Sequence, residues 1–459
     1  MDGNPMTPTR RDMLAGATAS LLLPRAAHAA LKTLTAKPGT AQLVPGAFDP
    51  TPIWGYDGGV PGPELRLKQG TRLTRRFANA LPQSSTIHWH GIRIDNAMDG
   101  VAGLTQPSVK PGDDFLYDFT VPDAGTYWYH PHDRTYEQAA RGLYGALIVE
   151  EVEPPEVDRD LVLILDDWRL AKDATIEDSF GAMHDMSHGG RIGNLITVNG
   201  HSEHAEPVKR GERLRLRLIN AANARIFTLQ TQGLAGWTVA LDGMPLETPV
   251  PLERLTLAPA QRIDLIVDVV AEEEALLVSL EQGGDFALAS FPVDGEARKT
   301  RQPDAVPLPP NPVPAITGLD DALVARLTMQ GGAMGGMREA WLGDEKLPIG
   351  DLVSKGYAWA FNGMAGMSDE PLMAVRRGDT LRIKMVNDTA WPHAMHLHGH
   401  HFRRVGEGGA LGPLRDTLLV ARAETVEIAF VADNPGEWLL HCHMLEHAAA
   451  GMMTRITVT

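Results

Sequence analysis

The residues with the clearest chemistry lie near the C-terminus of this 459-residue chain, around its only cysteine. Cys442 stands between His441 and His443, and His447 and Met452 follow it within ten residues. A thiolate, imidazoles and a thioether are the ligands of a blue-copper electron-transfer site. On a β-strand, the two neighbours of a residue point to the face opposite its own. We therefore expect Cys442 to bind one metal ion while its neighbours bind a second metal site behind the strand.

Four separate histidine pairs of the form His-x-His stand out in the chain, two in its first third and two in its last third. They are His88/His90, His130/His132, His396/His398 and His441/His443. Both histidines of a pair lie on one face of a strand, so eight imidazoles can meet at one interface. Neutral imidazole suits copper, and the set predicts a cluster of several metal ions. Unrelated structural histidines would explain four such pairs poorly.

One sequence unit is repeated three times, at 67–79, 208–220 and 375–387. Each copy has a glycine, alternating polar and apolar residues typical of a half-buried strand, and an asparagine nine residues after the glycine. Another nine residues lead to His88 in the first copy and His396 in the third, whereas the middle copy has lost its histidine pair. A later match aligns Pro131 with Cys442, so only the third copy can form the thiolate site.

Many short alternating segments between turn signals predict an all-β protein built from three β-sandwiches. The repeats place these domains at 30–152, 156–296 and 340–459, with metal-cluster ligands in the first and third domains only. We interpret residues 297–339 as a Pro-rich linker followed by a Met- and Gly-rich loop, which can include a short helix.

Residues 1–29 have the features of an export signal. Arg10 and Arg11 precede an apolar run that includes residues 21–23, and residues 27–29 form a cleavage signal of the A-x-A type. The paired arginines indicate the twin-arginine route, with a general secretory signal as the alternative. The apolar run is too short to cross a bilayer. We expect a mature periplasmic protein that is soluble and not inserted in a membrane.

Composition excludes one class of partner and one source of stability. The chain has 58 Asp and Glu against 42 Lys and Arg, a net charge of −16. Nucleic-acid phosphates bind Lys and Arg side chains, and this chain is acidic, so nucleic acid is not an expected partner. A single cysteine also rules out disulfides within the chain.

Taken together, the motifs resemble those of three-domain bacterial multicopper oxidases, and the resemblance covers the whole mature chain. It rests on residues 88–91, 129–132, 393–399 and 441–452. The resemblance implies cupredoxin-like Greek-key domains and four copper ions: one type 1, one type 2 and a type 3 pair. By position, the type 1 ligands would be His393, Cys442, His447 and Met452, the type 2 ligands His88 and His396, and the type 3 ligands His90, His130, His132, His398, His441 and His443.

The resemblance also implies two catalytic residues, Asp99 and Cys442. Cys442 would carry electrons between the two copper sites. O₂ reduction consumes protons, and Asp99 matches an acidic residue of the family eleven residues after His88, with a surface-loop aspartate as the alternative. Related cuprous oxidases have a glutamate directly after the type 1 histidine, where this chain has Ala448. Glu446 cannot be assumed to replace that glutamate.

The sequence leaves the reducing substrate open, although O₂ and a small reductant acting on a monomer are expected. Methionines and histidines gather at 183–188, 329–337 and 364–373. Thioethers favour Cu(I), but methionine is also common core filler. These clusters and the export signal favour a cuprous oxidase in periplasmic copper tolerance. His400 and His401 exceed the ligand count and are interpreted as residues around the ligands or on the surface.

Two alternatives remain. A laccase-like oxidase of phenols or aromatic amines would need an open, apolar pocket near His447. A non-catalytic structural or copper-binding relative would be expected to have lost cluster ligands, and here all of the family's ligand positions are filled. Two-domain nitrite reductases are excluded by the three repeats and by Cys442 lying in the last of them.

Overall fold

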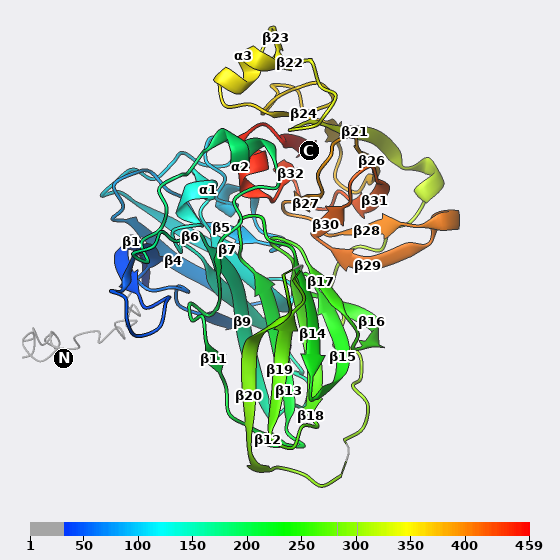
Figure 1. Ribbon diagram of the computed structural model, residues 1–459. Helices are drawn as coiled ribbons and strands as arrows, with labels where there is room; N and C mark the ends of the chain where they lie inside the picture. The colour runs from blue at the N-terminus through cyan, green and yellow to red at the C-terminus, as the bar shows by residue number, and fades with distance from the viewer. Residues whose placement is uncertain (1–31, 282, 301) are drawn as a thin grey trace, which may run out of the picture. The chain divides into compact units, whose positions relative to one another are not determined.

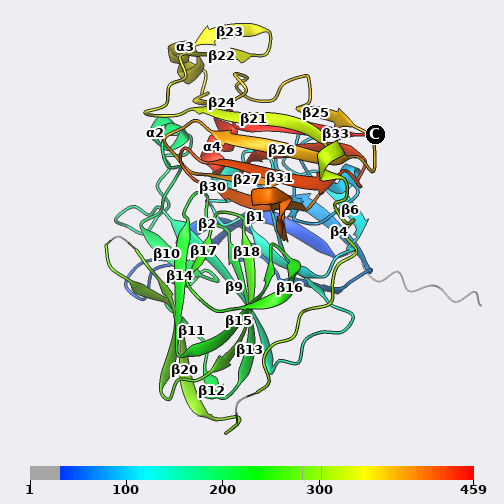
Figure 2. The same ribbon diagram turned by 90° about the vertical axis from the view of Figure 1, so that its right-hand side faces the viewer.

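Three pairs of β-sheets follow one another along the chain in the computed structural model, which describes residues 32–281, 283–300 and 302–459 (Figures 1 and 2). Thr33–Thr459 form one compact unit. The predicted all-β class with three β-sandwiches is confirmed. The predicted export signal lies outside the described residues. Among the described residues, no helix has the length and apolar character needed to cross a bilayer.

The first sandwich pairs two four-stranded sheets, in the orders β2-β1-β4-β6 and β3-β8-β7-β5. Strands β1 and β4 are parallel neighbours, as are β3 and β8, so the connections cross between sheets as in a Greek key. Its elements are β1 (Thr33–Ala41), β2 (Thr51–Tyr56), β3 (Leu65–Lys68), β4 (Arg72–Asn79), β5 (His88–His90), η1 (Asn96–Met98), β6 (Asp114–Thr120), β7 (Gly125–His130), α1 (Thr135–Gln138) and β8 (Gly145–Glu150).

The second sandwich has one sheet in the order β10-β9-β13-β18-β15-β16 and another in the order β11-β20-β19-β14-β17, with β12 paired to β20. Its elements are β9 (Arg159–Trp168), α2 (Met183–Ser187), β10 (Leu195–Val198), β11 (His204–Ala205), β12 (Val208–Arg210), β13 (Arg213–Asn220), β14 (Phe227–Gln232), β15 (Leu234–Leu241), β16 (Met244–Pro251), β17 (Leu255–Leu257), β18 (Arg262–Val269), β19 (Glu274–Ser279) and β20 (Phe286–Glu296).

The third sandwich has sheets in the orders β24-β21-β26-β31-β28-β29 and β25-β33-β32-β27-β30, and a separate hairpin of β22 and β23. Its elements are η2 (Leu319–Asp321), β21 (Leu323–Gly331), β22 (Glu339–Leu342), β23 (Glu345–Pro348), α3 (Ile349–Ser354), β24 (Trp359–Phe361), β25 (Met373–Val375), β26 (Thr380–Asn387), β27 (His393–Leu397), β28 (Phe402–Val405), η3 (Glu407–Gly409), β29 (Leu411–Arg415), β30 (Thr417–Val420), β31 (Thr425–Val431), β32 (Gly436–Cys442), α4 (Leu445–Ala449) and β33 (Met453–Val458).

Strand β21 lies in the segment that the sequence analysis interpreted as linker and loop. It runs parallel to β26 over Leu323–Met329. Its two buried side chains, Leu327 and Met329, alternate with more exposed residues, as one face of a strand requires. The nearby prolines and glycines hid this short alternation in the sequence, and the linker is shorter than expected.

The repeated asparagine has the same structural role in all three sandwiches. Asn79, Asn220 and Asn387 end β4, β13 and β26. Each side-chain amide donates hydrogen bonds to one backbone carbonyl four or five residues later and to one or two on a distant segment. Each side-chain oxygen accepts a bond from the backbone N–H two residues later. The asparagine therefore fixes the turn that leads to the following strand, which carries histidines in the first and third sandwiches.

Strand β13 is buried on both faces, whereas its alternation of polar and apolar residues predicts a strand buried on one face only. All of its residues are buried, including Arg215 and Arg217. Arg215 pairs with Glu151, and Arg217 donates a hydrogen bond of 2.8 Å to Thr126 of the first sandwich. Buried charges must be paired, and here carboxylates and a neighbouring sandwich replace the solvent.

The first and third sandwiches share one apolar core, which brings their histidine strands together. One cluster of buried side chains includes residues from Leu34 to Val149 and from Leu327 to Val458. A separate cluster, from Leu163 to Phe291, fills the second sandwich. The histidine pairs therefore lie where two sandwiches pack against each other.

Replacing Asn220 with alanine tests the turn role without touching a histidine strand. The carbonyls of Arg225 and Leu257 would lose their donor, and a buried group left unpaired costs about 1–3 kcal/mol. We expect a clearly lower midpoint of thermal unfolding with unchanged copper content. Gln230→Ala, at an exposed position of β14, is the control and should leave the midpoint near that of the wild type.

Candidate copper centres

Strand pairing places the histidine pairs side by side. In the first sandwich β5 lies antiparallel to β7, with His88 opposite His130. In the third, β27 lies antiparallel to β32, with His396 opposite His441. Rings from the two sandwiches then stack, as His90 and His396 do with their centroids 3.8 Å apart. The four sequence-predicted pairs thus form one cluster.

The eight imidazoles divide into smaller groups whose nitrogen atoms face one another. Nε2 of His398 lies 3.1 Å from Nε2 of His441, and Nδ1 or Nε2 atoms of His132 complete this group. Nε2 of His443 lies 3.4 Å from Nε2 of His130. Three overlapping groups have ligand nitrogens within 4.8 Å of one another: His132/His398/His441, His88/His90/His130 and His88/His396/His398.

Hydrogen bonds on one nitrogen leave the other nitrogen directed into the cluster. Nδ1 of His88 and Nδ1 of His396 donate to the backbone carbonyls of Asp99 and Asp416, at 2.8 and 3.0 Å. Their Nε2 atoms are buried and have no hydrogen-bond partner among the described residues. Metal-binding histidines typically donate their second N–H to an oxygen in this way, which fixes ring orientation. The buried, unpaired nitrogens fit metal binding.

The predicted thiolate site forms behind β32, on the other side from the cluster. Nδ1 of His393 lies 3.1 Å from Nδ1 of His447, and the sulfur of Cys442 lies 3.7 and 3.8 Å from these two nitrogens. A metal ion about 2.0 Å from nitrogen and about 2.3 Å from sulfur would hold its ligands at similar separations. Met452 is buried beside them, and its backbone bonds to Cys442 and His447.

The rings of the thiolate site are held in the opposite sense to those of the cluster. Nε2 of His393 bonds to the hydroxyl of Thr389 at 2.8 Å, and Nε2 of His447 donates to the carbonyl of His188 at 2.6 Å. Nδ1 is thereby left facing the cysteine sulfur. Neither Thr389 nor His188 was predicted as a site residue. A hydroxyl and a backbone carbonyl that orient an imidazole leave no ligand motif in the sequence.

Burial controls the protonation of these side chains. It lowers the pKa of His132 to about 3 and that of His447 to about 4, because an imidazolium ion loses its hydration. For the same reason it raises the pKa of the Cys442 thiol to about 12. Neutral imidazole is the metal-binding form, and a bound cation deprotonates a coordinating thiol. The imidazoles are therefore neutral and able to bind a metal ion, whereas the thiol keeps its proton until a bound cation displaces it.

Comparison with known proteins agrees with this geometry. Three models of the multicopper oxidase family match residues 39–154, 159–280 and 344–459. Multicopper oxidase MmcO of Mycobacterium tuberculosis is 31% identical over 87% of this chain and 82% of its own. The chain belongs to the multicopper oxidase family. It is an oxidoreductase that uses copper, O₂ and a reducing substrate.

Other relatives of this multicopper oxidase carry more specific names. A copper resistance protein A homolog of Pseudomonas syringae pv. tomato is 26% identical over 88% of each chain. A solved structure with a TM-score of 0.79 and 25% identity covers 94% of this chain and 97% of its own. It is described as a laccase-like multi-copper oxidase, CueO, of Ochrobactrum sp. with activity towards lignin model compounds. One name refers to copper resistance and the other to the oxidation of lignin model compounds.

Asp99 lies beside the cluster of this multicopper oxidase. Its side chain is 0% exposed, so the surface-loop alternative is wrong. Its Oδ2 accepts a hydrogen bond of 3.0 Å from Nδ1 of His398, and its Oδ1 lies 3.3 Å from Nδ1 of His88. Asp99 thus joins histidines of the first and third sandwiches through one carboxylate.

Asp416 is a second buried carboxylate at the cluster, and the sequence analysis missed it. Its oxygens lie 3.4 Å from Nε2 of His90 and 3.5 Å from Nδ1 of His396. Arg262 of the second sandwich holds Asp416 through two hydrogen bonds, one of them 2.9 Å long, and also donates to the carbonyl of Thr126. Burial alone would raise the pKa of Asp416, but the charge of Arg262 and the imidazoles hold it well below its ordinary value.

The surface placement considered for His400 and His401 is wrong. Both are buried, with 2% and 4% of their surface exposed. Nδ1 of His400 bonds to the carbonyl of His398 at 3.3 Å, and Nε2 of His401 lies 3.7 Å from Asp416. Both therefore surround the predicted ligands, which was the other interpretation of these residues.

A cavity of about 430 Å³ opens beside the cluster, and Ala448 is part of its wall. His132 and His441 line the same cavity, with Arg134 and Tyr136. Glu446 is not among the lining residues. Its Oε1 instead accepts a bond of 2.7 Å from Asn223, and burial raises its pKa to about 7. The carboxylate of cuprous relatives thus has no replacement in this cavity wall.

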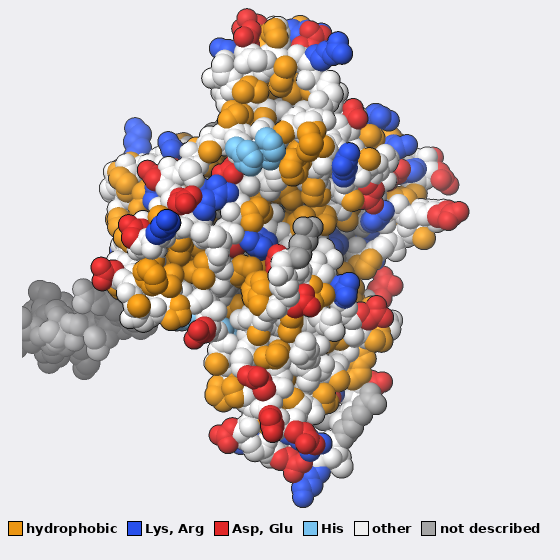
Figure 3. Space-filling model, in the orientation of Figure 1, with side chains coloured by type: hydrophobic (Ala, Val, Ile, Leu, Met, Phe, Trp, Pro, Cys, Tyr) orange, Lys and Arg blue, Asp and Glu red, His pale blue; other side chains and the backbone are white. Residues whose placement is uncertain are grey.

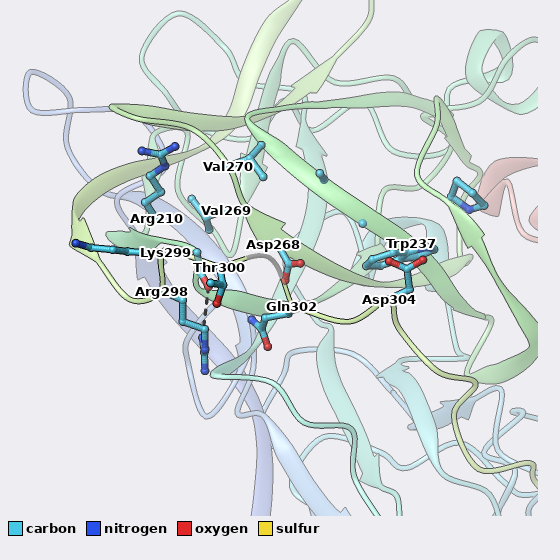
Figure 4. A pocket seen from close by; sticks show the side chains of 14 residues that line it. Arg210, Trp237, Asp268, Val269, Val270, Arg298, Lys299, Thr300, Gln302 and Asp304 are labelled. Carbon is cyan, nitrogen blue, oxygen red and sulfur yellow. Dashed lines mark hydrogen bonds between the residues drawn. The ribbon is translucent and has the colours of Figure 1, made fainter.

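A cavity of about 670 Å³ in the second sandwich is separate from both copper centres (Figure 4). Trp237, Arg210 and Arg298 are among its lining residues, and the lining contains no histidine, cysteine or methionine. Its volume exceeds that of the cavity beside the cluster. Size alone therefore does not locate the chemistry of this protein.

Replacing Arg262 with methionine tests how far the cluster depends on the second sandwich. Asp416 would remain as an unpaired buried charge, which costs about 3–5 kcal/mol. We expect a lower midpoint of thermal unfolding and less bound copper per protein. Arg403→Met is the control, because Arg403 pairs with the largely exposed Glu247 and such a pair contributes about 0–1 kcal/mol. Equal midpoints and copper contents for the two variants would contradict this prediction.

Proposed function

We propose that this multicopper oxidase oxidises Cu(I) in periplasmic copper tolerance. Four Cu(I) ions would give one electron each, and one O₂ would take four electrons and four protons to form two waters. The supporting observation is the enclosure of His447, whose side chain is 0% exposed and bonded to the His188 carbonyl. A phenol oxidase would need an open pocket at this histidine, whereas a single ion needs none.

We assign four copper ions to the two centres. Bound copper would supply one-electron transfer at the thiolate site and O₂ reduction at the cluster. The assignment is supported by the converging donor atoms and by the oxygen partners on the opposite ring nitrogens. The proposed ligands are His393, Cys442, His447 and Met452 for type 1, His88 and His396 for type 2, and His90, His130, His132, His398, His441 and His443 for the type 3 pair.

Cys442 would connect the two centres. Its backbone continues directly into His441 and His443, and Nδ1 of His441 donates to the Cys442 carbonyl at 2.9 Å. A covalent path and a parallel hydrogen bond thus lead from the thiolate to the cluster. The same residue therefore supplies a ligand and a route for electrons.

Asp99 would serve proton delivery. Its carboxylate contacts His88 and His398 at the cluster, where O₂ reduction consumes protons. The cavity wall at Ala448 offers no second carboxylate. We therefore propose Asp99 as the main acid of the site.

Periplasmic location is supported by the sequence of residues 1–29 and by the similarity to a copper resistance protein.

A laccase-like activity is the second candidate, favoured by the name of the Ochrobactrum relative. The enclosed His447 favours Cu(I) over bulky phenols. A non-catalytic role is disfavoured, since both donor sets are complete.

Replacing Cys442 with serine should remove one copper ion and leave three. A serine oxygen is a poor substitute for thiolate, so the blue absorption of the type 1 site should disappear while the cluster remains. Copper analysis and visible spectroscopy measure both effects. Met444→Leu, a volume-conserving change in the apolar core beside the site, should keep all four ions. Loss of the cluster copper in Cys442→Ser would contradict the assignment of two separate centres.

Oxygen uptake by the copper-loaded enzyme distinguishes the reductants. We expect rapid uptake with Cu(I) and slow uptake with a phenol, because a phenol cannot contact His447. The phenol reaction should be measured with and without added Cu(II), since added copper can act as a shuttle. Phenol turnover that needs no added Cu(II), together with negligible Cu(I) oxidation, would overturn the proposed function.

A further inference from the structure

Trp359, in β24, is a buried tryptophan that packs against both histidines of the thiolate site. Its ring centroid lies 4.5 Å from that of His447, with the ring planes at 41°. It also lies 5.1 Å from the ring centroid of His393, with the planes at 84°. Trp359 is 0% exposed. One indole ring therefore limits the movement of two proposed ligands of the same metal ion.

Hydrogen bonds on two sides fix Trp359 in this position. Its Nε1 donates to the carbonyl of Met186 in α2 at 2.6 Å. Its backbone N–H donates at 3.1 Å to the carbonyl of Ala450, the residue directly after α4. Helix α4 carries His447 and contacts α2. Trp359 thus connects a helix of the second sandwich with the helix that carries one of the proposed ligands.

Two glycines allow the backbone to pack directly on Trp359. A β-carbon at Gly332, where φ is +73°, would lie 2.0 Å from Cη2 of the indole. A β-carbon at Gly451, where φ is +123°, would lie 2.3 Å from the Trp359 carbonyl oxygen. Both distances are too short for any non-bonded contact. The chain therefore leaves no room for a side chain at either of these contacts with the tryptophan.

Helix α2 separates Trp359 from the outer surface on one side. Met186, whose carbonyl accepts the indole hydrogen bond, is buried, whereas the His184 side chain on the same helix is 78% exposed. Histidine side chains mark this helix on the surface of the molecule (Figure 3). Trp359 therefore lies between α2 and the two imidazoles, where its apolar ring keeps water away from that side of the thiolate site.

We propose that Trp359 is a positioning residue that raises the reduction potential of the type 1 copper. A Cu(II) ion bound to one thiolate keeps a net positive charge, whereas Cu(I) bound to one thiolate does not. Apolar surroundings without water therefore favour the reduced ion, and such surroundings are known to tune the potential of metal sites. The indole supplies them against two ligands at once. This inference rests on the proposed type 1 assignment and holds for any reductant.

Redox titration followed by the blue absorption measures this potential in the copper-loaded enzyme. Trp359→Gln would place a polar amide beside the two imidazoles and leave space for water. We expect this variant to have a lower reduction potential and a shifted blue absorption band. Trp359→Phe keeps an apolar ring but loses the hydrogen bond to Met186, so most of the potential should be recovered. If Trp359→Gln does not bind type 1 copper, the smaller fall in potential expected for Trp359→Phe decides the test.

Trp168 provides the matched control for a merely structural effect. It is 1% exposed, its Nε1 donates to Thr197 at 2.9 Å, and its apolar cluster contains none of the proposed copper ligands. Trp168→Gln and Trp168→Phe should lower the midpoint of thermal unfolding as the Trp359 variants do, but leave the potential unchanged.

The outcomes separate this inference from the ligand assignment on which it rests. A potential equal to that of the wild type in both Trp359 variants would overturn the proposed role of Trp359, even if both variants were less stable. An equal fall in potential in the Trp168 variants would also overturn it, because the effect would then not depend on contact with the imidazoles. A wild-type enzyme without blue copper would instead refute the type 1 assignment itself.

Discussion

Neighbouring side chains of β32 point to opposite faces of the strand, and both copper centres depend on this alternation. Cys442 faces the core of the third sandwich, whereas His441 and His443 face the first. The remaining architecture serves this strand: β27 supplies partners on both of its faces, and the first sandwich closes the cluster.

The second sandwich contributes to both centres although its copy of the repeat has no histidine pair. Arg262 stabilises Asp416 below the cluster and also contacts the first sandwich. Arg215 and Arg217 add buried ion pairs with Glu151 and Asp264. Such charges are costly unless every partner is present, so they specify one packing of the three sandwiches. The middle sandwich therefore acts as the electrostatic support of an interface formed by the other two.

Much of the site could be predicted because its donors follow local spacing rules. A two-residue period on strands identified the eight histidines, and the repeat showed which copies have them. Asp99 followed from the family resemblance. Asp416 and Arg262 could not be found in this way, since they are 154 residues apart and meet only after three sandwiches have packed. The same limit applies to His188, which contributes a backbone carbonyl that any residue type could supply. The alternation of polar and apolar residues also gave a wrong prediction of exposure at β13, because its polar face meets another sandwich.

The repeated asparagines identify the middle sandwich as a copy of the same unit that lacks the metal-binding histidine pair. Its contribution over the thiolate site comes from the long connection between β9 and β10, a segment outside the repeat. Insertions or deletions there can alter what reaches His447 while every ligand position stays unchanged. The surroundings of the thiolate site can therefore change without any change at the cluster, because the connection belongs to the second sandwich and all eight cluster histidines belong to the first and third.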